Sequence, residues 1–547
     1  MANTPVVVLD DTLTDIADAI RAKTGGSATM TPSEMPAQIA SIPSGGGGGA
    51  STQPKLTGYN RGTGVLTGEN LGSSGTVYVF DRMQNKGIAA TTSNWTANSI
   101  ALSAPVDLAN LTGITSIWVV PTGNTESNKL ILRGDIAVTG YGILYYVDNN
   151  DIVQTVTISS NTEWSGLIGS TNSWKTTINN IEIWNTQIVG LQIGSSITSI
   201  SYSFLGNCYN FNQPLDLSNV TSIGNSFLSN CANFNQPLDL SSVRTIGNSF
   251  LSYCYNFNQP LDLSNVTSIG NNFLSSCRSF DQPLNLGAIT TFYDSFLSDC
   301  NSFNQPLDLS NATSIAGYFL YNCGSFNQPL DLSNVTSIGY NFLSGCRSFN
   351  QPLNLPSATS IGNSFLANCV GFNQLLNFPN VTSISDGFLS GCVSFNQPLD
   401  LSGVTTTRGS FLSSCASFNQ PLDLSNVTSI GYNFLSGSNS FNQSLDLSSV
   451  TSIGNSFLSS CYAYSKKITL GAATCGTSFA QNCYSLTQLD VGTSTPPTDN
   501  NGLSSNMPTA RICTEGVTLT GANASAWKTA LPDRTSSPYR KLVDGTA

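Results

Sequence analysis

The stretch FNQPLDLSNVTSIGNSFLSNC, residues 211–231, indicates the architecture of this 547-residue chain. Its opening phenylalanine returns every 23 residues, and the positions around it return with it. Partial copies precede and follow the complete ones, which gives about thirteen coils. Self-similarity at a fixed short period is typical of a solenoid, in which each repeat is one turn of a long coil. The openings are Phe211, Phe234, Phe257, Phe280, Phe303, Phe326, Phe349, Phe372, Phe395, Phe418 and Phe441, with a degenerate copy at Tyr464.

Each copy carries an apolar set that it cannot bury alone, and stacking the copies joins these sets into one continuous core. The alternation in Leu215-Asp216-Leu217 predicts a short strand with its leucines inward and its aspartate outward. Stacked strands lie about 4.8 Å apart, so the coils of residues 188–490 should span roughly 60 Å. In the first complete copy the apolar set is Phe211, Leu215, Leu217, Val220, Ile223, Phe227 and Cys231.

The Ile-Gly, aromatic and Cys pattern of residues 223–231, followed by Phe234, resembles the BspA-type leucine-rich repeat. The Phe-Asn-Gln-Pro-Leu opening is also similar to surface-protein repeats of mycoplasmas. The resemblance covers about residues 188–490 and recurs in register. It implies a mainly β, leucine-rich-repeat solenoid of 23-residue coils, and a role in cell-surface adhesion and recognition.

Most of the 14 cysteines occupy a single slot of the repeat. Ser438 fills that slot once, so a small side chain suffices there, and we expect a buried packing position with reduced thiols. The chain has no Cys-x-x-Cys pair and no histidine, which argues against a zinc site. A disulfide among Cys475, Cys483 and Cys513 stays open. The slot holds Cys208, Cys231, Cys254, Cys277, Cys300, Cys323, Cys346, Cys369, Cys392, Cys415 and Cys461.

A stripe of aspartates is the main candidate ligand-binding surface. Stacked carboxylates about 5 Å apart in water repel each other by only about 0.8 kcal/mol, so a solvated face tolerates them. The alternative is contact with a divalent cation or with sugar hydroxyls. Asn285, Asn354 and Asn377 interrupt the series. The stripe consists of Asp216, Asp239, Asp262, Asp308, Asp331, Asp400, Asp423 and Asp446.

Two further sets of side chains have both a structural and a binding interpretation. Trp164 and Trp174 lie among serines, threonines and asparagines, where an exposed indole can stack on a sugar, although core packing is the plainer interpretation. Asn212 and its equivalents follow each opening phenylalanine. We expect them to form a ladder that satisfies backbone groups at the corners of the coils.

Composition excludes several classes of function. Charged residues are 9% of the chain, histidine is absent, and the net charge is −11. This acidity argues against sequence-independent binding to nucleic acid. The missing histidine removes Ser-His-Asp and Cys-His catalysis. Carboxylate pairs occur only as copies of the repeat and not as one asymmetric acid/base pair, and no P-loop, Gly-x-Ser-x-Gly or metal motif is present, so we expect neither an enzyme, a cofactor nor a metal.

The flanks of the solenoid divide into further predicted units. Residues 1–43 carry two capped helix signals, and 44–52 form a Gly/Ser linker. Residues 53–105 contain Leu66-Thr67-Gly68-Glu69-Asn70-Leu71-Gly72 and resemble the TIG immunoglobulin-like family. We expect a second β-rich unit at 106–187 and a C-terminal cap at 491–547, with a short helix at 522–531.

The helical stretch LTDIADAIRAKTGG…MTPSEMPAQIASIP, within residues 1–43, resembles a module on tail-associated proteins of phages that infect Gram-positive bacteria. It implies attachment to other virion proteins, with the solenoid adhering to a host surface glycan or protein. A wall polysaccharide or a teichoic acid suits identical coils. The chain shows no secretory signal and no membrane-spanning segment, so we expect a phage tail protein, which could form a homo-oligomer. A BspA-type bacterial surface adhesin and a passive spacer are the alternatives.

Overall fold

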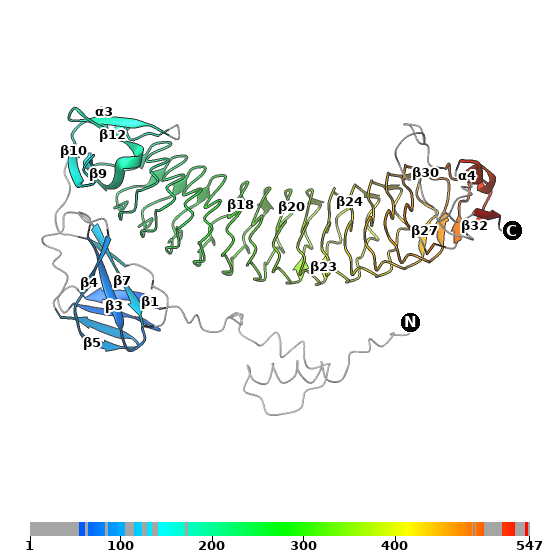
Figure 1. Ribbon diagram of the computed structural model, residues 1–547, viewed down its shortest axis with the longest axis horizontal. Helices are drawn as coiled ribbons and strands as arrows, with labels where there is room; N and C mark the ends of the chain where they lie inside the picture. Colours follow the sequence, from blue (N-terminus) through cyan, green and yellow to red (C-terminus); the bar gives the residue numbers. More distant parts are fainter. Residues whose placement is uncertain are drawn as a thin grey trace, which may run out of the picture.

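The computed structural model describes residues 54–60, 64–81, 86–103, 114–122, 127, 130–133, 141–169, 173–483, 485–486, 488–496, 517–530 and 542–544. A long, curved stack of coils dominates the molecule (Figure 1). The predicted helical module at 1–43 and the linker at 44–52 lie outside the described residues. Across the described ranges, no helix combines the length and the apolar character needed to cross a membrane.

A small β-sandwich precedes the coils. Two four-stranded antiparallel sheets share one core, in which Leu66 and Ile100 of the first sheet pack with Val77 of the second. The first sheet has the order β1 (Lys55–Asn60), β2 (Val65–Glu69), β6 (Ser99–Leu102) and β5 (Thr92–Thr96). The second has the order β4 (Lys86–Ala90), β3 (Gly75–Asp81), β7 (Ile114–Pro121) and β8 (Leu130–Arg133).

This sandwich corrects the predicted boundary at residue 105. Strand β7 pairs with β3 from Gly75↔Pro121 to Val79↔Ile117, so residues 114–133 complete the first unit rather than begin a second. Without β7 and β8, one edge of β3 would expose unpaired backbone groups. The kinship with the TIG family stays a prediction.

Residues 141–193 cover the first coil. The three-stranded sheet has the order β10 (Val153–Ile158), β9 (Gly142–Val147) and β13 (Ile188–Ile193). It is joined by α3 (Asn161–Ser165), the hairpin β11 (Lys175–Ile178) with β12 (Ile181–Trp184), and the 3-10 turn η1 (Asn185–Gln187). The ring of Trp164 lies 4.7 Å from that of Phe204, and one continuous core runs from this unit into the coils. Residues 141–187 are therefore a solenoid cap and not a separate domain.

The regular strand of each coil lies where Ser-Ile or Thr-Ile recurs, seven residues after the predicted start of the Leu-Asp-Leu strand. The strands pair in parallel and 23 residues apart, as in Ser222↔Thr245. The row consists of β14 (Ser199–Ile200), β15 (Ser222–Ile223), β16 (Thr245–Ile246), β17 (Ser268–Ile269), β18 (Thr291–Phe292), β19 (Ser314–Ile315), β20 (Ser337–Ile338), β22 (Ser360–Ile361), β24 (Ser383–Ile384), β25 (Thr406–Thr407), β26 (Ser429–Ile430), β28 (Ser452–Ile453) and β30 (Thr474–Cys475).

The Leu-Asp-Leu segment forms a second, less regular row. In several coils it contributes only isolated bridges, such as Leu215↔Leu238. Paired strands appear at β21 (Leu353–Asn354) with β23 (Leu376–Asn377), and at the C-terminal end. That end has β27 (Leu445–Leu447), β29 (Ile468–Leu470), β31 (Gln488–Asp490), β32 (Val517–Thr520) and β33 (Leu542–Asp544). The predicted strand is thus correct for part of the stack, and the sequence analysis missed the row at Ser-Ile.

Left-handed backbone closes each coil. In one coil Ser226, Leu228 and Asn230 have φ values of 59°, 52° and 62°, and equivalent positions repeat this along the stack. For residues other than glycine this conformation costs about 1–2 kcal/mol each. The alternation directs N–H groups along the axis, so that Ser226 donates to Asn248 O at 2.6 Å and Leu228 donates to Phe204 O at 3.1 Å. Hydrogen bonds between coils offset the local strain.

Two columns of stacked phenylalanines run through the core of the coils. Ring centroids in the Phe211–Phe441 column are 5.7–6.0 Å apart. In the Phe227–Phe457 column they are 5.3–5.8 Å apart, except for one step of 6.0 Å. The stack is curved, and β23 lies on the convex side while β18, β20 and β24 lie nearer the concave side (Figure 1).

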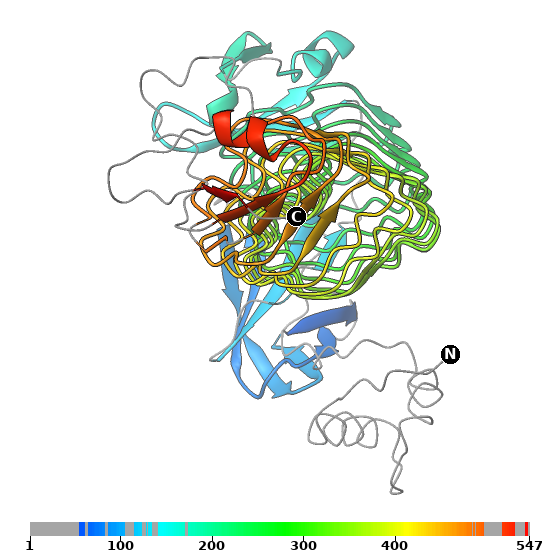
Figure 2. The ribbon, with the colours of Figure 1, turned by 90° about the vertical axis from the view of Figure 1, so that its right-hand side faces the viewer.

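The last coil is covered by α4 (Ala524–Ala530), the helix expected at 522–531. Trp527 is fully buried, meets the ring of Phe479 edge-on at 5.7 Å, and donates its indole N–H to Ser494 O at 3.2 Å. Strands β32 and β33 extend the second row past residue 490. Viewed along the axis, the coils overlie one another and α4 crosses their end (Figure 2).

Candidate functional site

The predicted aspartate stripe has a structural use in every coil that carries it. Each aspartate accepts the backbone N–H of the serine two residues later at 3.0 Å, as Asp262 does from Ser264, and so fixes a turn. Hydrogen bonds from Ser310 and Ser402 hold the pKa values of Asp308 and Asp400 below the usual range. Asp216 and Asp239 are half-buried, and the exposed members are Asp262, Asp308, Asp331, Asp400, Asp423 and Asp446.

The asparagines that interrupt the stripe also form hydrogen bonds within the protein. Asn285 accepts the N–H of Gly287 at 3.4 Å. Asn377 donates its side-chain N–H to Asn354 Oδ1 at 2.7 Å, where β21 and β23 pair. The aspartates occupy the same part of the coil as β23, which lies on the convex side (Figure 1). Turn formation therefore explains the stripe without a ligand.

The proposed sugar stacking by Trp164 and Trp174 is wrong. Their exposed fractions are 5% and 8%, so neither indole face is open to a sugar. Trp164 packs on Phe204, and Trp174 donates its indole N–H to Gly206 O at 2.8 Å. Both tryptophans join the N-terminal cap to the first coils.

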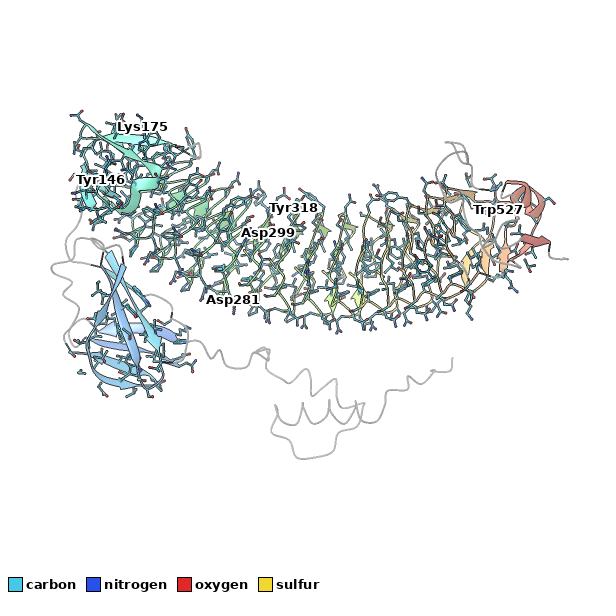
Figure 3. All side chains as sticks on the ribbon, in the orientation of Figure 1. Tyr146, Lys175, Asp281, Asp299, Tyr318 and Trp527 are labelled. Atoms are coloured by element: carbon cyan, nitrogen blue, oxygen red, sulfur yellow. The ribbon has the colours of Figure 1, made fainter. Side chains whose placement is uncertain are left out.

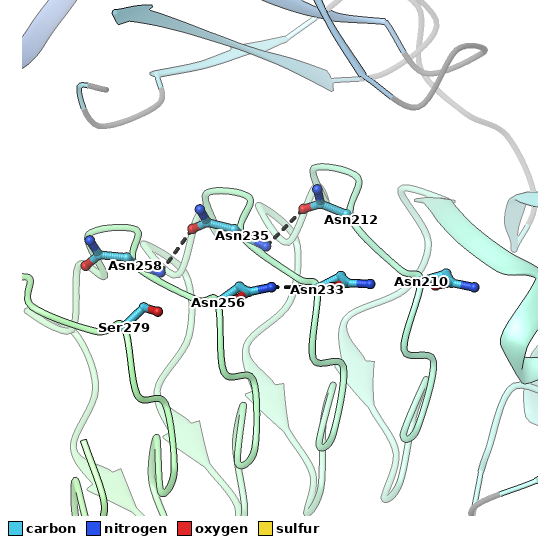
Figure 4. Close-up of a pocket in the computed structure, with 7 residues that line it drawn as sticks. All are labelled: Asn210, Asn212, Asn233, Asn235, Asn256, Asn258 and Ser279. Carbon is cyan, nitrogen blue, oxygen red and sulfur yellow. Dashed lines mark hydrogen bonds between the residues drawn. The ribbon is translucent and has the colours of Figure 1, made fainter. Parts of the chain in front are cut away.

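The asparagine ladder predicted at Asn212 is confirmed. Asn212 Oδ1 accepts the N–H of Asn235 at 2.9 Å, and Asn235 Oδ1 accepts the N–H of Asn258 at 3.0 Å. The ladder borders an open trough of about 690 Å³ (Figure 4). Its oxygens also accept glutamine side chains of the next coil, as from Gln236 at 3.2 Å. The lining residues are Asn210, Asn212, Asn233, Asn235, Asn256, Asn258 and Ser279.

The cysteine slot is buried and reduced, as predicted, but its thiols are also hydrogen-bond donors. Cys231 Sγ donates to Leu205 O at 3.1 Å, and the same bond recurs at 2.9–3.1 Å along the column. Ser438 Oγ replaces it with a 2.7 Å bond to Leu412 O. Burial raises the thiol pKa values, to about 12 for Cys369. Cys475 and Cys483 are free thiols as well.

Sequence reasoning missed a row of tyrosines in the segment between each Ser-Ile strand and the next opening phenylalanine. Because equivalent segments stack in register, these residues lie along one side, which we call the tyrosine side. Tyr318, one of them, is near the concave side and Asp281 is on the convex side (Figure 3). Aligning the 23-residue copies would have revealed the row, because most copies have Asn, Ser or Gly there. The exposed members are Tyr202, Tyr253, Tyr293, Tyr340, Tyr432 and Tyr462.

The densest part of the tyrosine side is a cluster of three rings. Tyr318 meets Tyr321 edge-on at 5.2 Å and Tyr340 edge-on at 4.9 Å. A hollow of about 320 Å³ adjoins Tyr321, which forms its aromatic wall. Amides and a guanidinium complete the hollow, so it offers both an apolar ring and hydrogen-bond donors. The other lining residues are Asn322, Ser344, Gly345, Arg347, Asn368 and Val370.

A second aromatic group lies nearer the N-terminal end of the stack. Tyr253 meets Tyr255 edge-on at 6.4 Å, and the Arg278 guanidinium lies 4.8 Å from the centre of the Tyr255 ring. Tyr253 is 48% exposed. Among the residues that the structure describes, no cluster of three or more His, Cys, Asp or Glu side chains could hold a metal ion.

Comparison with known proteins identifies the repeats. Residues 176–304 and 313–442 match the BspA type leucine rich repeat region, and residues 262–355 match a Mycoplasma protein family of unknown function. The solenoid is thus built of BspA-type leucine-rich repeats. A search of curated proteins gave no match.

The solved structures that resemble the chain include two leucine-rich repeat proteins. A leucine-rich repeat protein from Bacteroides ovatus is 18% identical, with a TM-score of 0.44, over 65% of this chain and 94% of the other. A leucine rich cell surface protein from Faecalibacterium prausnitzii is 16% identical, with a TM-score of 0.30, over 61% of this chain and 94% of the other.

Proposed function

We propose that this chain, whose solenoid is made of BspA-type leucine-rich repeats, is a non-enzymatic recognition protein that binds a polymer at a cell surface through its tyrosine side. The observation that carries the proposal is the placement of tyrosines where the fold disfavours them. Tyr253 and Tyr318 have φ values of 64° and 56°. Equivalent positions in other coils hold residues suited to that backbone, such as Asn230 and Gly345. The leucines with this backbone conformation, such as Leu228, are buried in the core, whereas Tyr253 is 48% exposed, so its strained placement points to a function other than folding.

The charge of the solenoid favours a neutral polymer over a teichoic acid. Residues 188–490 contain thirteen aspartates and six lysines or arginines. The phosphate groups of a teichoic acid would be repelled by the net negative charge of this surface. Sugar hydroxyls, in contrast, form hydrogen bonds with carboxylates and amides. Exposed tyrosine rings add apolar area at small cost in side-chain entropy. Ligand contact through the aspartate stripe receives no support, because those carboxylates already hold turns.

A binding protein of this kind fits two locations, a bacterial surface and a phage tail. The BspA-type repeats support a bacterial surface adhesin. The alternative, a phage tail protein attached to other virion proteins, rests on the resemblance of residues 1–43 to a tail-associated module. Deleting residues 1–44 should abolish incorporation into a particle if the tail assignment holds, and should leave binding by the solenoid intact. Antibody labelling of intact cells and of purified phage distinguishes the two locations.

The test of binding uses the full chain and purified Gram-positive cell walls, before and after extraction of teichoic acid. We expect saturable binding that survives the extraction. The triple variant Y253N/Y318N/Y432N places at each position a residue type that other coils carry, so it should fold and lose binding. The matched control D262N/D308N/D331N alters the convex side and should bind like the wild type. If the wild-type chain does not bind at all, the spacer interpretation replaces this proposal.

A further inference from the structure

The coils follow a longer period that the 23-residue repeat conceals. The position two residues after the last residue of each Ser-Ile-type strand cycles through Asp, Gly, Tyr and Asn twice in succession. Equivalent residues of the two cycles are therefore four coils apart. In chain order the position reads Asp294, Gly317, Tyr340, Asn363, Asp386, Gly409, Tyr432 and Asn455.

Each Asp-Gly-Tyr run builds the same three-layer stack. Gly317 donates its N–H to Asp294 Oδ1 at 2.7 Å, and Gly409 donates to Asp386 Oδ1 at 2.8 Å. The ring of the tyrosine in the third coil lies against the glycine of the second. A Cβ at Gly317 would overlap the ring of Tyr340, and one at Gly409 would overlap the ring of Tyr432.

The ring position brings each phenol close to its aspartate two coils away. The Asp386 carboxylate raises the pKa of Tyr432, both by its charge and by accepting a hydrogen bond from the phenol. Desolvation and the Asp294 carboxylate raise the pKa of Tyr340. Both tyrosines remain open to solvent, with exposed fractions of 43% for Tyr340 and 50% for Tyr432. Each stack therefore presents a fixed aromatic ring beside a half-buried carboxylate.

The fold itself does not need these stacks. At the same position, Asn248 donates its N–H to Asn225 Oδ1 at 2.8 Å, and Asn271 donates to Asn248 Oδ1 at 2.8 Å. Asparagine at this position thus forms a second ladder from coil to coil, separate from the one at Asn212. Gly317 and Gly409 have no side chain that could accept the next N–H, so this second ladder is interrupted twice in the same way. The same departure is thus repeated at an interval of four coils.

We propose that the Asp294–Gly317–Tyr340 and Asp386–Gly409–Tyr432 stacks are two equivalent subsites for one linear, neutral glycan that runs along the solenoid axis. This inference rests on the proposed function and specifies its ligand. The tyrosine ring packs on the C–H face of a sugar, and the aspartate accepts hydrogen bonds from its hydroxyls. Stacked strands rise about 4.8 Å per coil, so the subsites lie about 19 Å apart. A glycan must span that distance to occupy both.

Bivalency sets the expected magnitude. Once one subsite is occupied, the second binds the same chain at a high effective concentration, which raises affinity by about 100-fold or more. Oligomers too short to reach both stacks should bind weakly, and affinity should increase abruptly at the length that spans them. Replacing either tyrosine should remove the increase, because a single remaining subsite binds long and short oligomers alike.

The experiment measures binding of the full chain to neutral glucan, mannan, galactan and N-acetylglucosamine oligomers of increasing length, with a ribitol phosphate polymer as the anionic comparison. The variants are Y340N and Y432N, since asparagine occupies this position in other coils. The control is D262N, which alters an exposed carboxylate of the convex side, away from the tyrosine side and outside both stacks. For the neutral polymer that binds, we expect about a 100-fold loss with each stack variant and no change with D262N.

Deleting residues 349–371 removes one whole coil between the stacks. It reduces their separation to about 14 Å and should shift the length threshold to a shorter oligomer. Undiminished binding by Y340N/Y432N, or an unchanged threshold in the deletion variant, would overturn the paired subsites and leave the proposed function standing. Preference for the ribitol phosphate polymer would overturn the neutral class. If the wild-type chain binds none of the polymers, both the inference and the proposed function fail.

Discussion

Ser438 offers a direct test of the hydrogen bonds that the cysteine column donates. Its side chain is fully buried. Ser438 Oγ donates to Leu412 O at 2.7 Å and accepts the N–H of Cys415 at 3.1 Å. Substitution of Ser438 by alanine deprives both backbone groups of this partner. A buried polar group left without a partner costs about 1–3 kcal/mol, so S438A should destabilise the surrounding coils by about 2–5 kcal/mol.

The matched variant is S438C, which places at this position the residue that the eleven other copies carry. A thiol in this slot donates to the equivalent carbonyl at 2.9–3.1 Å, so S438C should lose no more than about 1 kcal/mol. Because coils interact mainly with their neighbours, the loss in S438A should be local. Urea unfolding measures how much stability S438A loses. Hydrogen exchange at Leu412 and Cys415 shows whether the loss is confined to these coils. Equal stability of S438A and S438C would refute the role of the donor and leave only packing.

Three further predictions concern other buried or capped groups. The thiols of the cysteine column should resist iodoacetamide in the native protein at neutral pH and react fully in denaturant, because burial raises their pKa values; mass spectrometry after brief labelling checks this. Hydrogen bonds led by that from the Ser159 N–H lower the pKa of Glu163 to about 2 from 4.5, so its stabilisation of the N-terminal cap is present above pH 4.5 and is lost as the pH falls toward 2. E163Q should remove this pH dependence of the stability of the N-terminal cap. Equal stability of the wild-type and E163Q caps at neutral pH would contradict the prediction. Thr407 Oγ1 is buried without a hydrogen-bond partner, so T407V should stabilise by about 1 kcal/mol in urea unfolding, with T406V at a half-buried position as the control.

The parts of the fold that follow from periodicity could be predicted from the sequence. A phenylalanine repeated every 23 residues has to stack on its copies, because one coil cannot bury it. The exchange of cysteine for serine at Ser438 marked a small buried slot, and Asn212 marked a ladder at a corner. Each inference used a side chain whose chemistry allows few environments. Because the same residue recurs in many copies, each inference is supported at many positions.

Other features depend on backbone conformation or on pairing between distant segments. The left-handed φ of Leu228 contradicts its intrinsic preference and exists because neighbouring coils supply the hydrogen bonds. The strand Ser222–Ile223 has only two residues, too few for an alternating pattern. The pairing of β7 with β3 joins segments whose individual patterns do not identify their partners. These features form only when the coils stack or the strands pair, so the local sequence alone does not predict them.

The different uses of positions within the coil explain why we place the proposed recognition on the tyrosine side. The phenylalanine columns, the asparagine ladder and the aspartate turns occupy positions whose side chains are committed to packing or to backbone hydrogen bonds. Only residues that keep the same packing or the same hydrogen bond are tolerated there, as Asn285 keeps the turn bond of the aspartates. The segment after the Ser-Ile strand is different, because its backbone bonds join coils regardless of the side chain, as Ser226 and Tyr318 both show.

Such a segment can vary while the fold stays constant. It varies in an ordered manner, since Tyr340 and Tyr432 recur with the same aspartate and glycine partners four coils apart. A passive spacer would have no reason to keep that interval, because any coil supports its neighbour equally well. A ligand that is itself periodic does supply a reason, since only subsites at matching intervals can engage it together. The spacing of the variable residues, more than their identity, is therefore the part of this sequence that carries information about the ligand.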